Sequence, residues 1–122
     1  MIDVPTSKPV VWLGSTRKDF RAFPDEVKSE MGYGLFQAQL GGRHRRAKTL
    51  SGFGGSGVVE IIADHRGDTF RTVYTVRFAS AVYVLHAFQK KSKKGIATPK
   101  ADIELIERRL RDAEAIEKGE SE

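Results

Sequence analysis

Residues 82–94 read VYVLHAFQKKSKK, and they decide how the rest of the chain can be arranged. The first half alternates like a half-buried strand, in which residues two apart share one face of a sheet. Strict alternation puts Val82, Val84, His86, Phe88 and Lys90 on one face, and Tyr83, Leu85, Ala87, Gln89 and Lys91 on the other. Four lysines lie within the last five residues, a charge density that a core does not tolerate. The segment therefore predicts a strand that leaves the core and ends in a cationic cluster.

Two further strands are expected before this one. Residues 58–63 are rich in β-branched side chains, and the turn DHRGD at 64–68 leads to a second alternating run at 69–77. Arg71 and Tyr74 point to opposite faces of that run. The connections are short, whereas parallel neighbours need a crossover of a dozen residues or more, so we expect an antiparallel meander.

The first forty residues predict a short strand and two helices. Apolar residues at 10–13 form the strand, and Ser15 is placed to cap a helix that ends near Phe23. Pro24 suits the first turn of a second helix, which Gly41-Gly42 ends. Side chains at helical spacing give these helices one apolar face: Phe20, Phe23, Val27, Met31, Leu35 and Ala38.

A last helix is expected at 99–118, capped by Thr98 and carrying one apolar stripe. The chain of 122 residues then forms a single domain, 1–122, with residues 1–8 as a loose lead. The expected fold class is α+β, with two N-terminal helices packed on a mainly antiparallel twisted sheet of four to five strands, plus the C-terminal helix.

Composition narrows the class of protein. The chain has no cysteine and only three histidines, which excludes disulfides and disfavours a structural metal. No signal peptide and no apolar run of about 20 residues is evident, so we expect a cytoplasmic protein without a membrane partner. We expect no cofactor and no metal.

The charge is distributed unevenly along the chain. Residues 1–98 carry 16 Lys and Arg against 8 Asp and Glu, whereas residues 99–122 carry 5 against 8. A basic body of this kind indicates a polyanionic partner, of which nucleic acid is the commonest. A cationic surface that only aids solubility is the plainer interpretation, and charge alone does not separate the two.

Two local motifs lie between the second helix and the strands. Residues 43–48, RHRRAK, form a basic run beside the sheet, and GFGGSG at 52–57 is rich in glycine. The glycine segment lacks the GK[ST] ending of a phosphate-binding loop and precedes a strand rather than a helix. We interpret it as a hairpin connection.

The segments FPDEVKSEMGYGLFQAQLG, KTLSGFGGSGVVEI, FRTVYTVRF and YVLHAFQKKSKKGIATP, in this order of elements, resemble the RelE/ParE toxin superfamily, specifically its phage-derived, HigB-like branch. The resemblance spans about residues 9–112, and HAFQKKS followed closely by TP is its most specific part. It implies a RelE-like fold and the toxin of a type II toxin-antitoxin system. Such a toxin is usually a ribosome-dependent mRNA endonuclease (mRNA interferase) that inhibits translation, and a cognate antitoxin, often with a helix-turn-helix domain, neutralises it.

Metal-independent RNA cleavage requires deprotonation of a 2′-OH, stabilisation of charge on phosphorus and protonation of the leaving oxygen. The resemblance and these needs together give the candidate catalytic residues Arg71, His86, Lys90, Lys91 and Tyr74. The candidate RNA-binding residues are Lys48, Arg43, Arg45, Arg46, Arg66, Lys93 and Lys94.

Each candidate also has a structural explanation. His86 could be a satisfied core histidine, Arg71 could pair with Glu60, and Tyr74 could belong to the core. Lys90 and Lys91 point to opposite faces of a regular strand, although a bulge near Gln89 would bring them together.

Two other functions stay open. One branch of the superfamily inhibits DNA gyrase with the same fold and without ribonuclease chemistry, so the fold supports a toxin more strongly than an enzyme. A non-enzymatic basic RNA-binding module is the third hypothesis, but no RNP-like aromatic motif supports it.

Overall fold

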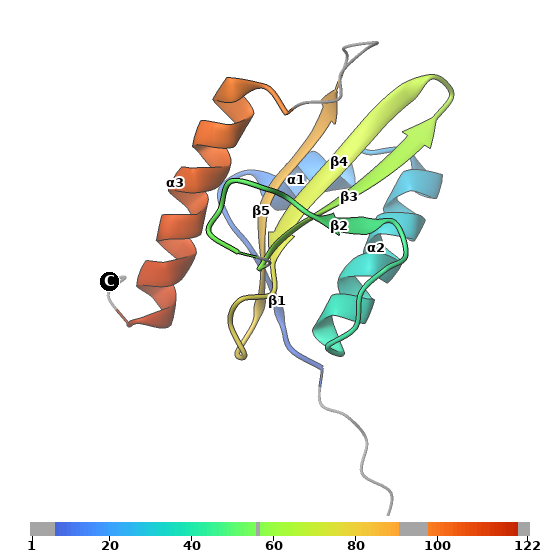
Figure 1. Cartoon of the computed structure of the whole chain (residues 1–122). Coiled ribbons are helices and arrows are strands. Elements are labelled where there is room, and N and C mark those ends of the chain that lie inside the picture. The colour runs from blue at the N-terminus through green and yellow to red at the C-terminus, as the bar shows by residue number, and fades with distance from the viewer. Residues whose placement is uncertain (1–6, 56, 91–97, 120–122) are drawn as a thin grey trace, which may run out of the picture.

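The computed structural model describes residues 7–55, 57–90 and 98–119, which form one mixed sheet and three helices (Figure 1). The sheet has the strand order β1-β5-β4-β3-β2. Its strands are β1 (Val10–Trp12), β2 (Ala47–Thr49), β3 (Val58–His65), β4 (Asp68–Thr75) and β5 (Val82–Lys90). Only the β1–β5 pair among them is parallel, so the expected antiparallel meander is confirmed.

The helices cover the two faces of the sheet. They are α1 (Thr16–Arg21), α2 (Asp25–Gln39) and α3 (Lys100–Glu117). The first two pack on one face, and α3 lies across the other (Figure 1). The expected α+β fold class is therefore confirmed. Among the helices of the described part of the chain, none combines the length and the apolar content that a membrane span requires.

The helix starts differ from the sequence-based expectation in their caps. Pro24 and Pro99 are themselves the N-cap residues, with ψ near 150°, and their carbonyls accept the first intrahelical bonds. Thr98 is therefore not the cap of α3, and the prediction was wrong by one residue. Ser15 is the N-cap of α1, but its hydroxyl donates to Asp19 Oδ2 over 2.7 Å instead of accepting from the backbone.

The face under α1 and α2 is an apolar core. Met31 of α2 and Ile61 of β3 are completely buried there, and Phe23 packs on Phe70 with ring centroids 5.1 Å apart. Gly34 is part of this packing, because a Cβ at that position would overlap Ile61 Cδ1. The glycine that weakens the helix in isolation thus allows α2 to approach the sheet closely.

The face under α3 has a second apolar core at one end. It joins Leu85 of β5 to Ile106 and Leu110 of α3, and it includes Phe53 from the glycine-rich segment. That segment connects the antiparallel strands β2 and β3, so it is a hairpin connection as expected. Arg77 fixes it by donating from Nη2 to the Phe53 carbonyl over 2.7 Å.

A β-bulge in β5 changes the expected facing of its side chains. Val73 pairs with His86 and Tyr74 pairs with Val84, which leaves Leu85 as an extra residue. Strict alternation was therefore wrong: Val82 and Val84 face α1 and α2, whereas the side chains from His86 to Lys90 shift by one position. Arg109 of α3 donates to the Leu85 carbonyl over 3.0 Å, which satisfies a group that the bulge takes out of the ladder.

Candidate functional site

A cleft of about 380 Å³ opens on the α3 face of the sheet. Its walls come from β2 and the residues after it, from β3 and β4, and from the start of α3. The lining residues are Lys48, Thr49, Leu50, Ser51, Glu60, Arg71, Thr98 and Ile103. Two of the predicted site residues, Lys48 and Arg71, therefore meet at one cleft although 23 positions separate them in the sequence.

A buried ion pair forms the floor of this cleft. Arg71 Nη1 lies 2.8 Å from Glu60 Oε2, and the two residues are 4% and 1% exposed. The register explains the contact, because Glu60 pairs with Val73 and Arg71 with Ile62 on the adjacent strand. Glu60 is thus the structural partner that the sequence suggested for Arg71, and it holds the guanidinium in a defined position.

Lys48 and Lys90 flank the ion pair from two further strands. Lys48 is exposed and lies opposite Glu60 in the β2–β3 ladder. Lys90 lies diagonal to Arg71 across β4 and β5 and is only 6% exposed. Burial and the nearby Arg71 guanidinium lower the pKa of Lys90, and the carboxylates of Glu60 and Asp102 oppose that shift. Three cations and one carboxylate therefore occupy neighbouring positions on this face.

His86 is bonded to α3. Its Nε2 lies 2.7 Å from Asp102 Oδ1, and its ring stacks on Phe88 with centroids 4.3 Å apart. Nδ1 is buried without a hydrogen-bond partner in the described structure. Burial lowers the pKa of His86, and the Asp102 carboxylate acts against this. Both ring nitrogens are therefore withheld from the solvent, and His86 is placed as a buried histidine.

Asp102 is the partner of His86 that sequence reasoning missed. An acidic residue in the first turn of a helix is expected from the helix dipole alone, so the position of Asp102 in α3 does not by itself indicate a site. Only the packing of α3 across β5 brings its carboxylate to His86, 16 positions earlier in the chain.

Tyr74 lies on the opposite face of the sheet from Arg71. It is 1% exposed in the core under α1 and α2, and burial raises its pKa to about 12 although the Arg43 guanidinium acts in the other direction. The structure therefore does not bring it together with the cations of the cleft.

The basic run at 43–46 also lies on the side of α2. Arg46 pairs with Glu30 of α2 over 3.2 Å, and Arg43 lines a separate hollow of about 330 Å³ with Tyr74. Arg45 is exposed beside them. Arg66 is at the tip of the β3–β4 hairpin with a φ of 52°. Their roles in RNA binding stay predictions, and none of these four arginines is among the residues that line the cleft.

Three predicted residues, Lys91, Lys93 and Lys94, lie outside the described residues. Within the described ranges, no group of three or more His, Asp or Glu side chains is arranged to hold a metal ion. The chemistry that the described residues offer comes from cationic side chains, a buried carboxylate and a carboxylate-bound imidazole.

Comparison with known proteins gives one family. The model of the family described as "Phage derived protein Gp49-like (DUF891)" matches residues 18–111. Among solved structures, a chain of the toxin-antitoxin complex RelBE2 from Mycobacterium tuberculosis matches with 18% identity and a TM-score of 0.45. The match covers 75% of this chain and 100% of that chain. No curated protein matches significantly.

Proposed function

This chain belongs to the family of phage-derived Gp49-like proteins, and on that premise we propose that it is the toxin of a type II toxin-antitoxin pair that cleaves mRNA at the ribosome. The observation that carries the proposal is the position of Lys48, Arg71 and Lys90. They come from three different strands to one face of the sheet, where Lys48 and Arg71 line one cleft and Lys90 lies diagonal to Arg71. The resemblance of the HAFQKKS segment to the HigB-like branch supports the same function.

The cations suit the charge that develops during RNA cleavage. The 2′-oxygen loses its proton and attacks the adjacent phosphorus, and the 5′-oxygen leaves with a proton, which gives a 2′,3′-cyclic phosphate and a 5′-hydroxyl. The pentacoordinate phosphorus carries extra negative charge, and cations fixed before the reaction stabilise it best. Arg71 is fixed in this way by Glu60, and its guanidinium places a positive charge beside the cleft.

Lys90 is the candidate for proton transfer. A lysine with an ordinary pKa near 10.5 is almost fully protonated at neutral pH, so it makes a poor proton acceptor. Because burial and Arg71 lower the pKa of Lys90, a larger fraction is neutral and able to accept the 2′-OH proton. His86 would take part only after α3 releases it, since Asp102 occupies Nε2 and Nδ1 is buried.

The partners follow from this function. Translated mRNA and the ribosome are the targets, a cognate antitoxin is the inhibitor, and the cytoplasm is where they meet. A small helix-turn-helix protein encoded in the adjoining reading frame is the antitoxin that we expect.

The test is expression of the chain without its neighbour, with mapping of the 5′ ends of translated transcripts. Lys90→Met keeps the volume of a buried side chain and removes the amine, and Lys48→Ala removes an exposed cation. Each should slow cleavage, by about 100-fold for a group that acts on the transition state. Lys28→Ala on α2 is the matched control, because it also removes one positive charge and should leave cleavage unchanged.

Growth arrest with intact transcripts would overturn the proposal that the chain is a ribonuclease. If DNA breaks then precede any loss of mRNA, the gyrase-inhibitor alternative replaces it. Unchanged cleavage by both Lys90→Met and Lys48→Ala would remove this cleft from the reaction.

A further inference from the structure

Three large apolar side chains are exposed along one helix. Tyr33, Phe36 and Leu40 are 58%, 49% and 46% exposed, and they lie in or directly after α2. In the described part of the chain the only other apolar side chain of this size and exposure is Ile116, at 37% on α3. Exposed apolar side chains scattered singly need no explanation, but three in one stripe do.

The stripe is opposite the buried side of α2. Spacings of three and seven residues place Tyr33, Phe36 and Leu40 on one face of a helix. The core-facing residues, among them Met31 and Leu35, point to the other side. The sheet therefore buries one face of α2, and the stripe is on the opposite face.

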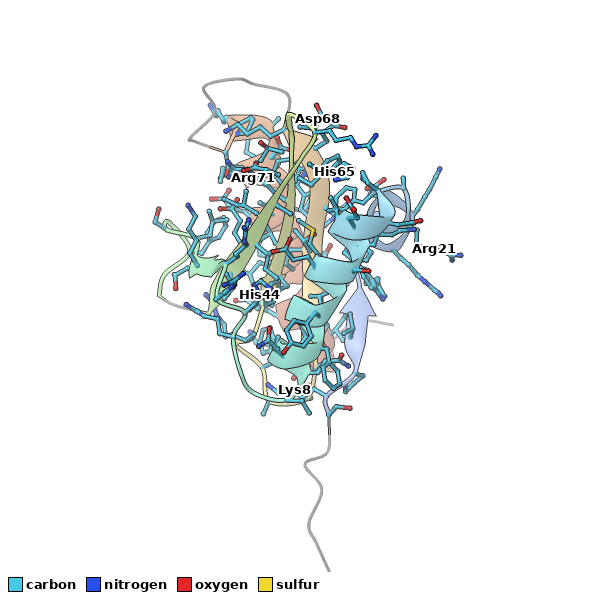
Figure 2. The ribbon with its side chains drawn as sticks, turned by 90° about the vertical axis from the view of Figure 1, so that its right-hand side faces the viewer. Lys8, Arg21, His44, His65, Asp68 and Arg71 are labelled. Atoms are coloured by element: carbon cyan, nitrogen blue, oxygen red, sulfur yellow. The ribbon has the colours of Figure 1, made fainter. Side chains whose placement is uncertain are left out.

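Positive charge lies along one side of the stripe. The ring of Tyr33 contacts His44 edge-on, with centroids 5.9 Å apart, so the segment 43–46 runs beside the stripe. Arg43 and Arg45 of that segment are exposed. Figure 2 shows His44 beside the later turns of α2 and Lys8 below its end. Of the three acidic residues of the helix, Asp25 and Glu26 are in its first turn at the opposite end, and Glu30 pairs with Arg46.

A hollow of about 330 Å³ lies next to Leu40, since the residues that follow it in the chain line this hollow. Gly41 and Gly42 line it together with two cations, Lys8 and Arg43, and with Tyr74. The hollow thus has two cationic side chains in its wall, and Lys8 Nζ also donates to the Phe78 carbonyl over 3.4 Å. A carboxylate is the group that these donors fit.

We propose that the stripe Tyr33, Phe36 and Leu40 is the docking surface for an acidic amphipathic segment of the antitoxin. This rests on the proposed function for the identity of the partner. The apolar side chains of the segment cover the stripe, and an Asp or Glu enters the hollow between Lys8 and Arg43. Such a segment lies along α2, with its acidic residues toward the C-terminal end of the helix.

Charge argues against a second copy of this chain as the occupant. The chain carries a net charge of +5, and a two-fold contact through the stripe would bring two sets of Arg43 and Arg45 close together. An acidic partner gains from the same charges. The surface is on the face of the sheet opposite the cleft, so a partner held here leaves Arg71 and Lys48 uncovered by this contact.

The test is a binding measurement between the purified chain and the protein encoded in the adjoining reading frame. Phe36→Asp places a charge in the middle of the stripe and should weaken binding by about 100-fold. Ile116→Asp is the matched control, because it makes the same kind of change at an exposed position on α3, and its affinity should stay within about threefold of wild type. Arg45→Glu should weaken binding by about tenfold, and Arg17→Glu on α1 should not.

Wild-type affinity in Phe36→Asp would overturn the proposed docking surface. An equal loss of affinity in Ile116→Asp would overturn it as well. A neighbour-encoded protein that does not bind at all overturns it too. If the wild-type chain is itself a dimer that Phe36→Asp dissociates, the stripe joins two copies and the proposal is wrong. The binding measurement needs no RNA, so the two proposals can fail separately. If the partner binds through the stripe but the chain does not cleave RNA, only the proposed ribonuclease activity is overturned.

Discussion

The two faces of the sheet use the same strands but bury different chemistry. Under α1 and α2 the interior is mainly apolar along β3 and β4, and the buried hydroxyl of Thr72 donates to Met31 Sδ over 3.0 Å. Under α3 it is apolar only around Leu85 and Ile106, and the other end of that face buries Glu60 and Arg71. Apolar burial is non-directional, whereas a buried ion pair is stable only when both partners are present. The charged end of the α3 face is the region to which our proposal assigns the function.

The largest expected effect tests that contrast. Glu60→Ala removes the carboxylate that faces a buried guanidinium, which should lower the free energy of unfolding by about 3–5 kcal/mol. The double change Glu60→Leu with Arg71→Met should recover most of this stability without recovering RNA cleavage. Urea denaturation followed by circular dichroism gives the stabilities. A loss below about 1 kcal/mol in Glu60→Ala would show that solvent reaches the pair and that the two faces do not differ as described.

A pair of glycines tests the packing of the apolar face. Gly34→Ala puts a methyl group against Ile61 in a filled core and should destabilise the protein by about 1–3 kcal/mol. Gly32→Ala on the same helix meets nothing within 4 Å and should stabilise it by up to about 1 kcal/mol through helix propensity. Thermal unfolding of the two variants should move in opposite directions. A stable Gly34→Ala would mean that α2 is not held tightly to the sheet.

A tyrosine on each face permits a comparison at alkaline pH. Tyr83 donates to Glu117 Oε2 over 2.5 Å, and burial together with that carboxylate raises its pKa to about 12. Its contribution to stability is therefore complete below pH 10 and is lost as the pH rises from 10 toward 12. Tyr83→Phe should cost about 1 kcal/mol at pH 7 and should make the alkaline loss less steep. Because burial raises the pKa of Tyr74 to about 12 as well, part of the loss should persist in Tyr83→Phe and disappear when Tyr74→Phe is added.

The smallest expected effect concerns His86. Its pKa is lowered, so the unfolded chain binds the proton more readily and this group removes stability as the pH falls through about 6.5. Asp102→Asn takes away the carboxylate that opposes the shift, so the pKa of His86 should fall further. An NMR titration of the imidazole measures the pKa of His86 in the wild type and in Asp102→Asn. A pKa above 6.5 in the wild type would indicate that the ion pair with Asp102 outweighs burial.

The elements of the fold could be predicted from the sequence because each depends on local patterns. Alternation at 69–77, prolines at helix starts and helical spacing from Phe20 to Ala38 all act over a few residues. The errors were local too. Thr98 and Pro99 differ by one position as caps, and the bulge at Leu85 moved His86 and Lys90 to the other face. Strict alternation does not foresee an extra residue, since nothing in the sequence alone shows which carbonyl Arg109 will satisfy.

The candidate site was only partly accessible from the sequence. Charge and the HAFQKKS segment singled out Arg71, Lys90 and Lys48, and these do share one face. Tyr74 is also a candidate catalytic residue from the sequence, although alternation places it on the face opposite Arg71. The structure keeps it in the apolar core. Asp102 had no signal of its own, because an acidic residue in a first helical turn is ordinary.

The sequence by itself determined the cationic end of β5, the meander and the helices, because residue type and spacing within a segment set these. Only the tertiary structure decided which of the cations meet, because that depends on register, on one bulge and on the way α3 crosses the sheet. The strand at 82–90 thus has its charge from its sequence. Its orientation comes from contacts with Val73, Tyr74 and Arg109, which are distant in the chain.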